Sequence, residues 1–229
     1  SETDRLTRLV NDVLDLSRLE SGKIIQLEPM DIKPAIEQTL RNYRLNATEK
    51  NVSLAHEIEE TIPSILGNFD LLLQVFDNLL GNGLKFSPKN STLMIRAYTW
   101  PDTCPALPPN DMKDAAPNCE LVSPLPKVRI EIADTGSGIS QADQEKIFDR
   151  FYRVENAVHT EQGTGLGLSI VRGIIEKHGG EIRMASELGI GTTFWFDLSL
   201  EQSDKYELTA QTINKNSDNF SDSQIGELI

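Results

Sequence analysis

The sequence predicts a mixed α/β domain, and three features of its apolar pattern support this prediction. Helical periodicity and strand-like alternation succeed one another along the chain. A strand over 128–133 alternates apolar with charged residues, so one face of its sheet is expected to be buried. The helical pattern that follows Asn68 is apolar on one side only, which suits a helix on the flank of such a domain. With 229 residues and 38% hydrophobic content, the chain can fill one core.

The first predicted element is a helix over 2–22, which Gly22 ends. Its apolar residues recur at spacings of three and four, as in a helix that pairs with other helices: Leu6, Leu9, Val13 and Leu16. An amphipathic helix packed on its own domain would show a similar pattern, and the sequence leaves this alternative open. Because the chain starts at Ser1 within this helical pattern, we expect a fragment of a longer protein.

Two further helices and a strand are expected before residue 90. Asp31 can act as the N-cap of a helix with Pro34 in its first turn and with apolar residues at Ile36, Leu40 and Tyr43. Alternation over 52–58 predicts a strand. After Gly67, Asn68 can cap a third helix, and one face of that helix is apolar: Leu72, Val75, Phe76, Leu79 and Leu80.

The middle of the chain predicts two neighbouring strands joined by an irregular insertion. The strands cover 93–98 and 128–133, and residues 101–127 between them contain seven of the chain's 11 prolines. Cys104 and Cys119 lie in this insertion. We interpret them as free thiols rather than a redox pair, because two cysteines make no disulfide framework.

A short helix, a longer helix and two strands complete the predicted fold. Ser140, with Asp143 three residues later, opens a short helix within 140–153. The longer helix ends at Gly179-Gly180, and its apolar face is Leu168, Val171, Ile174 and Ile175. Strands follow near 181–186 and 192–199. From about residue 200 the acidic and polar composition predicts a disordered tail.

Two glycine-bearing loops give the strongest indication of function. Asp134-Thr135-Gly136-Ser137-Gly138 follows a strand, and Gly163-Thr164-Gly165-Leu166-Gly167-Leu168 precedes a helix. A polyphosphate can approach bare backbone, and the first N–H groups of a helix have no partner within it. Neither loop fits the dinucleotide or P-loop pattern. We therefore predict a nucleotide pocket of a different fold, in which Asp134 accepts a hydrogen bond from the adenine amine; an ordinary Asp-Thr-Gly turn remains the alternative.

The overall charge limits the partners of the chain. Lys and Arg total 22 against 35 for Asp and Glu, so the net charge of −13 repels nucleic acid and anionic lipid. The same field opposes ATP, and a nucleotide site would therefore need a divalent cation, backbone N–H groups and nearby Lys or Arg. No segment approaches the roughly 18 to 20 apolar residues of a membrane span, so we expect no membrane segment in this piece and a cytoplasmic location.

Three polar residues share one face of the third helix. Asn78 and Asn82 are one turn apart, and Lys85 follows three residues later. An amide oxygen is a hard neutral ligand that suits Mg²⁺, and Lys85 can neutralise a phosphate. Taken alone, this spacing would favour a solvated helix face. Its weight comes from the glycine loops that accompany it.

The order and spacing of these segments resemble the sensor histidine kinases of two-component systems. Four motifs carry the resemblance: an N box at 78–87, a G1 box at 134–138, an F box at 147–153 and a G2 box at 163–168. Residues 189–194 resemble the closing Gly-x-Gly-Thr-x-Phe strand of this family, and 2–22 resemble the second helix of its dimerisation domain. The insertion and the Thr99-Trp100-Pro101 segment before it resemble the cyanobacterial and plastid NblS type.

The resemblance implies an α/β two-layer sandwich of the Bergerat (GHKL) type, with a mixed sheet backed by helices on one face. ATP would lie between the N-box helix and a mobile lid over about 140–163. The implied division is a partial dimerisation helix over 1–22, a catalytic ATP-binding domain over 23–199 that contains the insertion, and the tail over 200–229.

The motifs also imply roles for individual residues. Asn82 and Asn78 would serve Mg²⁺, Lys85 the phosphates, and Asp134 the adenine. Arg153 would stabilise charge in the transition state. The backbone beneath the base and around the phosphates would come from the two loops: Gly136, Gly138, Gly163, Thr164, Gly165, Leu166, Gly167 and Leu168.

One position separates kinases from ATPases of this fold. Gyrase-type and chaperone ATPases carry a Glu four residues before the metal-binding Asn, where it acts as the base for water; here that place holds Asn78. An amide cannot take the proton, so we expect transfer to an external nucleophile rather than hydrolysis. A regulatory module that binds nucleotide without chemistry remains an alternative.

The expected nucleophile, a His on the preceding helix, is absent from the chain. His56, His159 and His178 do not match its motif. We therefore expect this fragment to be inactive in autophosphorylation alone. The expected partners are the missing phosphoacceptor helix, a second subunit in a full-length homodimer that is membrane-anchored, and a response regulator.

Overall fold

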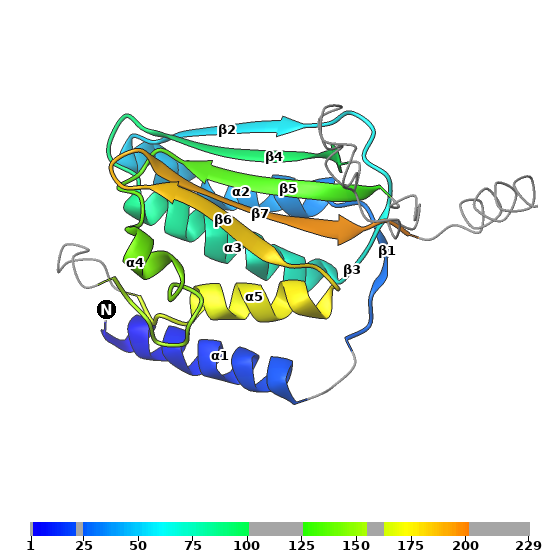
Figure 1. Cartoon of the computed structure of the whole chain (residues 1–229), viewed down its shortest axis with the longest axis horizontal. Helices are drawn as coiled ribbons and strands as arrows, with labels where there is room; N and C mark the ends of the chain where they lie inside the picture. The colour runs from blue at the N-terminus through cyan, green and yellow to red at the C-terminus, as the bar shows by residue number, and fades with distance from the viewer. Residues whose placement is uncertain (1, 22–24, 101–125, 155–162, 202–229) are drawn as a thin grey trace, which may run out of the picture.

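A five-stranded mixed sheet forms one layer of the molecule (Figure 1). The computed structural model describes residues 2–21, 25–100, 126–154 and 163–201. Across the sheet the strands are β2 (Ser53–Ile58), β4 (Thr92–Trp100), β5 (Lys127–Asp134), β7 (Gly191–Ser199) and β6 (Ile182–Glu187). The pairing of β2 with β4 is parallel and the other three pairings are antiparallel. The predicted strands are therefore present, and they form one sheet.

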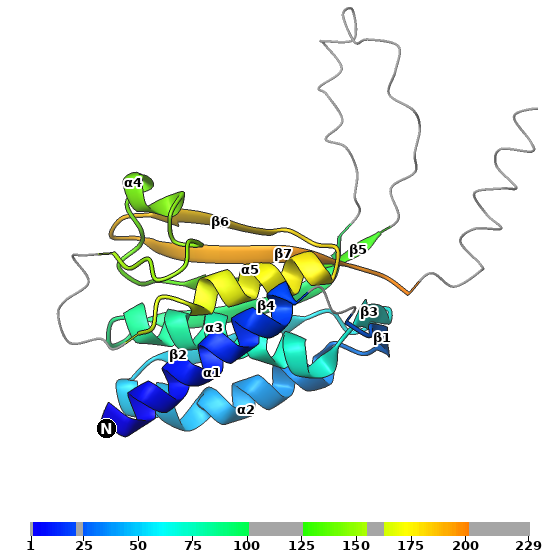
Figure 2. The same cartoon turned by 90° about the horizontal axis from the view of Figure 1, so that it is seen from below.

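Three helices cover one face of this sheet: α2 (Lys33–Lys50), α3 (Phe69–Phe86) and α5 (Gly167–Lys177). A fourth, α1 (Glu2–Glu20), packs outside them against α5 (Figures 1 and 2). The long helices all lie on this side of the sheet, whereas the short helix α4 (Gln141–Gln144) lies beside β6 (Figure 2). This is the predicted two-layer arrangement, with the core between the sheet and the inner helices.

The alternation of β5 explains its place in the centre of the sheet. Val128 and Ile130 are fully buried and face the helices. Between them, Arg129 points to the other face, where its Nε lies 2.7 Å from Asp197 Oδ1 and its guanidinium stacks on Trp100. Helix α3 is anchored as predicted, because the Oδ1 atom of Asn68 accepts the N–H of Leu71 at 3.2 Å. Its predicted apolar face is buried in the core.

Two predicted helix boundaries differ from the structure. Helix α2 begins at Lys33, with the buried Ile32 as N-cap, although Asp31 Oδ1 still accepts the N–H of Lys33 at 2.9 Å. The short helix expected within 140–153 is only α4 (Gln141–Gln144). The Asp143 carboxylate accepts hydrogen bonds from the hydroxyls of Ser140 and Tyr152. Phe151 has a positive φ of 62°, which excludes a continuous helix through the F box.

Helix α1 has two apolar sides rather than one seam. Leu16 and Leu19 pack against the core, whereas Leu6 and Val13 are 64% and 42% exposed. Leu16 and Leu19 therefore fit a helix packed on its own domain, and pairing of α1 with other helices stays a prediction. A second sheet of two short strands, β1 (Glu28–Met30) and β3 (Ile65–Gly67), was not predicted.

Several predictions fall on residues outside the described part of the chain. These include most of the insertion with Cys104 and Cys119, His159 in the predicted lid, and 202–229 of the predicted tail. Leu200, at the start of that tail, is buried and pairs with Ile65. Within the described residues, none of the helices has the length and hydropathy that crossing a membrane requires.

Candidate nucleotide-binding site

Asp134 is the last residue of β5, and its carboxylate is partly buried where the strand ends. The N–H of Gly136 donates to Oδ1 at 2.8 Å, which holds the carboxylate in place. Burial raises the pKa of this carboxyl above its ordinary value of 3.8, and hydrogen bonds from the backbone of Gly136 and Thr192 act in the opposite direction. The sequence did not identify Thr192, which reaches Asp134 through the register of β5 and β7.

The loop after Asp134 approaches its neighbours so closely that side chains are excluded. A Cβ added at Gly136 would lie 2.6 Å from Asp134 Oδ1 and 2.8 Å from the carbonyl oxygen of Phe86, at the end of α3. Gly138 has a φ of +65°, and its added Cβ would lie 2.0 Å from the carbonyl oxygen of Glu187. The G1 box is thus packed closely between the end of α3 and the β6–β7 turn, and only glycine fits at these two positions.

The polar face of α3 meets the G2 loop at two places. Asn78 donates from Nδ2 to the carbonyl of Gln74 at 3.0 Å, and its Oδ1 lies 2.7 Å from the position of a Cβ at Gly167. Lys85 Nζ lies 3.2 Å from the corresponding position at Gly163. Asn82, partly exposed, is one turn beyond Asn78 on the same face. Two of the three predicted N-box residues, Asn78 and Lys85, therefore lie against the predicted phosphate loop, and Asn82 shares their face of α3.

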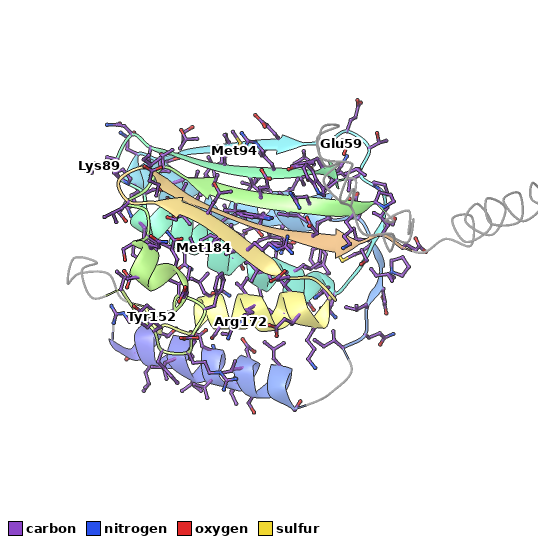
Figure 3. The ribbon with its side chains drawn as sticks, viewed as in Figure 1. Glu59, Lys89, Met94, Tyr152, Arg172 and Met184 are labelled. Atoms are coloured by element: carbon purple, nitrogen blue, oxygen red, sulfur yellow. The ribbon has the colours of Figure 1, made fainter. Side chains whose placement is uncertain are left out.

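The F box packs against the G2 box through the backbone. The N–H of Phe151 donates to the carbonyl of Gly165 at 2.9 Å, and Gly165 has a φ of +73°. Tyr152, labelled in Figure 3, donates from its hydroxyl to Asp143 Oδ1 at 2.7 Å. Arg153 follows as an exposed residue. Residues 155–162, the middle of the predicted lid, lie outside the described residues.

Thr164 connects the G2 loop to helix α1. Its hydroxyl donates to Asp12 Oδ2 at 2.6 Å and accepts the N–H of Leu166 at 3.3 Å. Leu166 is fully buried and is the N-cap of α5, whereas Leu168 is partly buried in its first turn. No sequence signal identified Asp12, because a contact between residues 152 positions apart depends on the tertiary fold.

These elements together present the groups that a metal-bound nucleotide needs. A partly buried carboxylate lies beside the G1 loop, while the amide oxygen of Asn78, the ammonium group of Lys85 and the first turn of α5 lie at the other loop. Such a set can bind an adenine amine at one end and a charged triphosphate at the other.

Comparison with known proteins agrees with this geometry. Residues 67–202 match the family described as histidine kinase-, DNA gyrase B-, and HSP90-like ATPase. The chain belongs to this family, because the match covers more than half of its length.

Two similar relatives are a drug sensory protein and a sensor-like histidine kinase. The chain is 52% identical to "Drug sensory protein A" of Synechocystis sp. over 202 residues, and this aligned region covers 88% of the chain and 28% of that protein. It is 51% identical over 197 residues to "Uncharacterized sensor-like histidine kinase ycf26" of Pyropia yezoensis, with 86% and 28% covered. The chain thus spans less than a third of these relatives, and they agree with the predicted cyanobacterial and plastid type.

Solved structures share the fold. Full-length ShkA in complex with AMPPNP aligns with a TM-score of 0.66 at 29% identity, over 87% of this chain and 37% of that one. ThkA in complex with the response regulator TrrA aligns with a TM-score of 0.60 at 21% identity, over 86% and 48%. The chain is accordingly the catalytic ATP-binding domain of a two-component sensor histidine kinase, with the GHKL ATPase fold.

Proposed function

We propose that this domain binds MgATP between α3 and the G2 loop and transfers the γ-phosphoryl group to a histidine supplied by a dimerisation helix. The observation that carries the proposal is the convergence of Asn78 and Lys85 on the glycines of the G2 loop. In the transfer, an imidazole nitrogen forms a P–N bond while the bond from the γ-phosphorus to the β–γ bridging oxygen breaks, and ADP leaves. The phosphoryl group then passes to an Asp of a response regulator.

Asp134 recognises the adenine in this proposal. Its carboxylate accepts the N–H of the exocyclic amine, while Gly136 and Gly138 leave room for the ring. Because burial already removes much of the water from this carboxylate, the hydrogen bond to the base requires little further desolvation.

The residues present fit a Mg²⁺ ion. Asn78 and Asn82 offer neutral amide oxygens, and Asn78 Oδ1 lies so close to Gly167 that a side chain at this position would clash with it. When bound, Mg²⁺ would neutralise part of the triphosphate charge. The backbone of 163–168 and the Lys85 ammonium hold the phosphates, and Arg153 provides charge for the transition state.

The chain's own residues favour transfer over hydrolysis. Asn78 occupies the position of the general base in related ATPases, and an amide does not accept a proton at neutral pH. Water therefore lacks activation, and an external nucleophile with its own lone pair is the better acceptor.

Helix α1 is proposed to be the partial dimerisation helix over 1–22, followed by the catalytic domain over 23–199 and the tail over 200–229. One side of α1 exposes four apolar residues: Leu6, Val10, Val13 and Leu14. Such a stripe suits burial against the phosphoacceptor helix and a second subunit. The fragment alone is then inactive in autophosphorylation and lies in the cytoplasm, and its response-regulator partner is inferred from the ThkA complex.

The test is to supply the phosphoacceptor helix in trans with γ-labelled ATP. We expect phosphohistidine on that helix, and Asn82→Ala should abolish it while the fold is retained. Failure to label at any helix concentration would contradict the proposal. Retained ATP binding in that case would favour a regulatory module without chemistry.

A further inference from the structure

Helix α1 is hydrogen-bonded to both elements of the proposed nucleotide site. Asp12 Oδ2 accepts the hydroxyl of Thr164, in the G2 loop, at 2.6 Å. One turn later, Asp15 Oδ2 accepts Gln74 Nε2 at 2.7 Å, and the carbonyl of Gln74 in turn accepts the side-chain amide of Asn78 at 3.0 Å. Two carboxylates of α1 thus contact the loop and the helix that would surround the phosphates. Helix α1 lies beside α5 in both views of the ribbon (Figures 1 and 2).

The contact with Thr164 places the negative charge of Asp12 at the G2 loop, where the phosphates of the nucleotide would add further negative charge. Thr164 Oγ1 accepts the N–H of Leu166 at 3.3 Å while it donates to Asp12. Asp12 is therefore linked through a single hydroxyl to one of the first amides of α5. These amides attract anions. The Asp12 carboxylate and a triphosphate would therefore compete for this end of α5, and the two negative charges would repel each other.

The packing between α1 and α5 leaves a groove between the two helices. Leu19 touches Gly173, where an added Cβ would lie 3.4 Å from Cδ1. Beside this contact, a groove of about 320 Å³ separates Leu16 and Leu19 from Ser169 and Arg172. Helix α1 is thus held by the apolar contacts of Leu16 and Leu19 and by the hydrogen bonds of Asp12 and Asp15.

We infer that Asp12 is a positioning residue through which the docking of α1 on α5 and the binding of the nucleotide oppose each other. The inference rests on the proposed function, because it requires the phosphates to lie at the G2 loop. Docked α1 weakens nucleotide binding, and by linkage bound nucleotide weakens the docking of α1 to the same degree. Displacement of α1 by its missing helix partner would then favour the nucleotide-bound state.

The first test measures the affinity of Mg-AMPPNP by calorimetry on the whole chain. Asp12→Asn removes the charge and keeps the shape, and it should tighten binding by about threefold to tenfold, the range expected for one like charge near a partly solvated phosphate. Glu37→Gln, an exposed residue paired with Arg41 on α2, makes the same change in net charge and should leave the affinity unchanged.

The second test follows α1 itself by amide hydrogen exchange. Saturating Mg-AMPPNP should speed the exchange of residues 2–20 in the wild type, and Asp12→Asn should speed it without nucleotide. A purely structural role for Asp12 would produce the second effect but no change in affinity.

The outcomes separate the inference from the function on which it rests. Equal or weaker binding by Asp12→Asn than by the wild type would overturn the inference and leave the proposed function standing. Slower or unchanged exchange of α1 on adding Mg-AMPPNP would also overturn it. No binding by the wild type would overturn both.

Discussion

The backbone N–H of Asn68 donates to Nε2 of His178 across 3.0 Å and joins the start of α3 to the end of α5. The other ring nitrogen, Nδ1, lies 2.7 Å from the carbonyl oxygen of Ile174. Because Nε2 accepts, Nδ1 must carry the proton, and the ring is held in one neutral tautomer. His178 therefore joins α3, which bears the N box, to α5, which follows the G2 box. Protonation of Nε2 would break the hydrogen bond from Asn68.

This contact predicts a loss of stability in mild acid. Burial lowers the pKa of His178 below its ordinary value of 6.5. Between the lowered pKa and 6.5 the unfolded chain binds a proton that the folded chain excludes, so the free energy of unfolding falls as pH drops through this window. Urea unfolding at pH 7.5 and 5.5 should show this fall in the wild type and less of it in His178→Gln.

The control for this prediction is His56→Gln, which changes an exposed histidine on β2. It should keep the pH dependence of the wild type. The same dependence in His178→Gln would exclude the buried histidine as its source.

Removal of the Asp134 carboxylate should weaken adenine recognition. Asp134→Ala loses a charged hydrogen bond of roughly 1.5 to 3 kcal/mol, which corresponds to about tenfold to 150-fold in ATP affinity. Inosine triphosphate has no exocyclic amine and serves as the matched ligand. The wild type should prefer ATP and the variant should bind both nucleotides equally; a preference that survives in Asp134→Ala would remove this residue from the adenine site.

The buried charge of Asp134 should also destabilise the fold at neutral pH. The raised pKa means that the folded chain holds a proton more tightly than the unfolded chain, so ionisation above that pKa lowers stability. Asp134→Asn removes the ionisation and keeps the acceptor for Gly136. Urea unfolding at pH 7.5 should show the variant to be at least as stable as the wild type, and a clear loss of stability would contradict the sign of this effect.

Substitutions at Gly138 and Gly189 should distinguish the cost of backbone strain from the cost of a steric clash. Gly138 and Gly189 both have positive φ, but a Cβ at Gly138 meets a carbonyl oxygen at 2.0 Å, whereas one at Gly189 meets nothing within 4 Å. Gly189→Ala should cost about 1 to 2 kcal/mol from strain alone, and Gly138→Ala should cost more because the G1 loop must also move. Equal losses in urea unfolding would mean that the G1 loop is not constrained by the β6–β7 turn.

The sequence predicted those parts of the fold that depend on local pattern. Asn68 caps α3 as expected, because an N-cap forms within one helical turn, and the alternation of β5 was enough to assign its buried face. Helix α4 was predicted too long, since the turn at Phe151 follows from its contact with Gly165 and not from local propensity. The β1–β3 pairing was missed because three-residue strands carry no periodic signal.

The candidate site followed the same division. Asn78 and Lys85 were identified only because the glycine loops accompany their spacing, and the structure brings both residues close to glycines of the G2 loop. Asp12 and Thr192 reach the site only through helix docking and strand register, neither of which the sequence pattern specifies.

The most direct test of the central claim is a calorimetric titration of the natively folded chain with ATP, with and without Mg²⁺. The account predicts saturable binding to a single site in the presence of Mg²⁺, much weaker binding when EDTA removes the ion, and a marked loss in Asn82→Ala with the fold intact. A folded wild-type chain that gives no heat with MgATP and does not retain the nucleotide in equilibrium dialysis would contradict it.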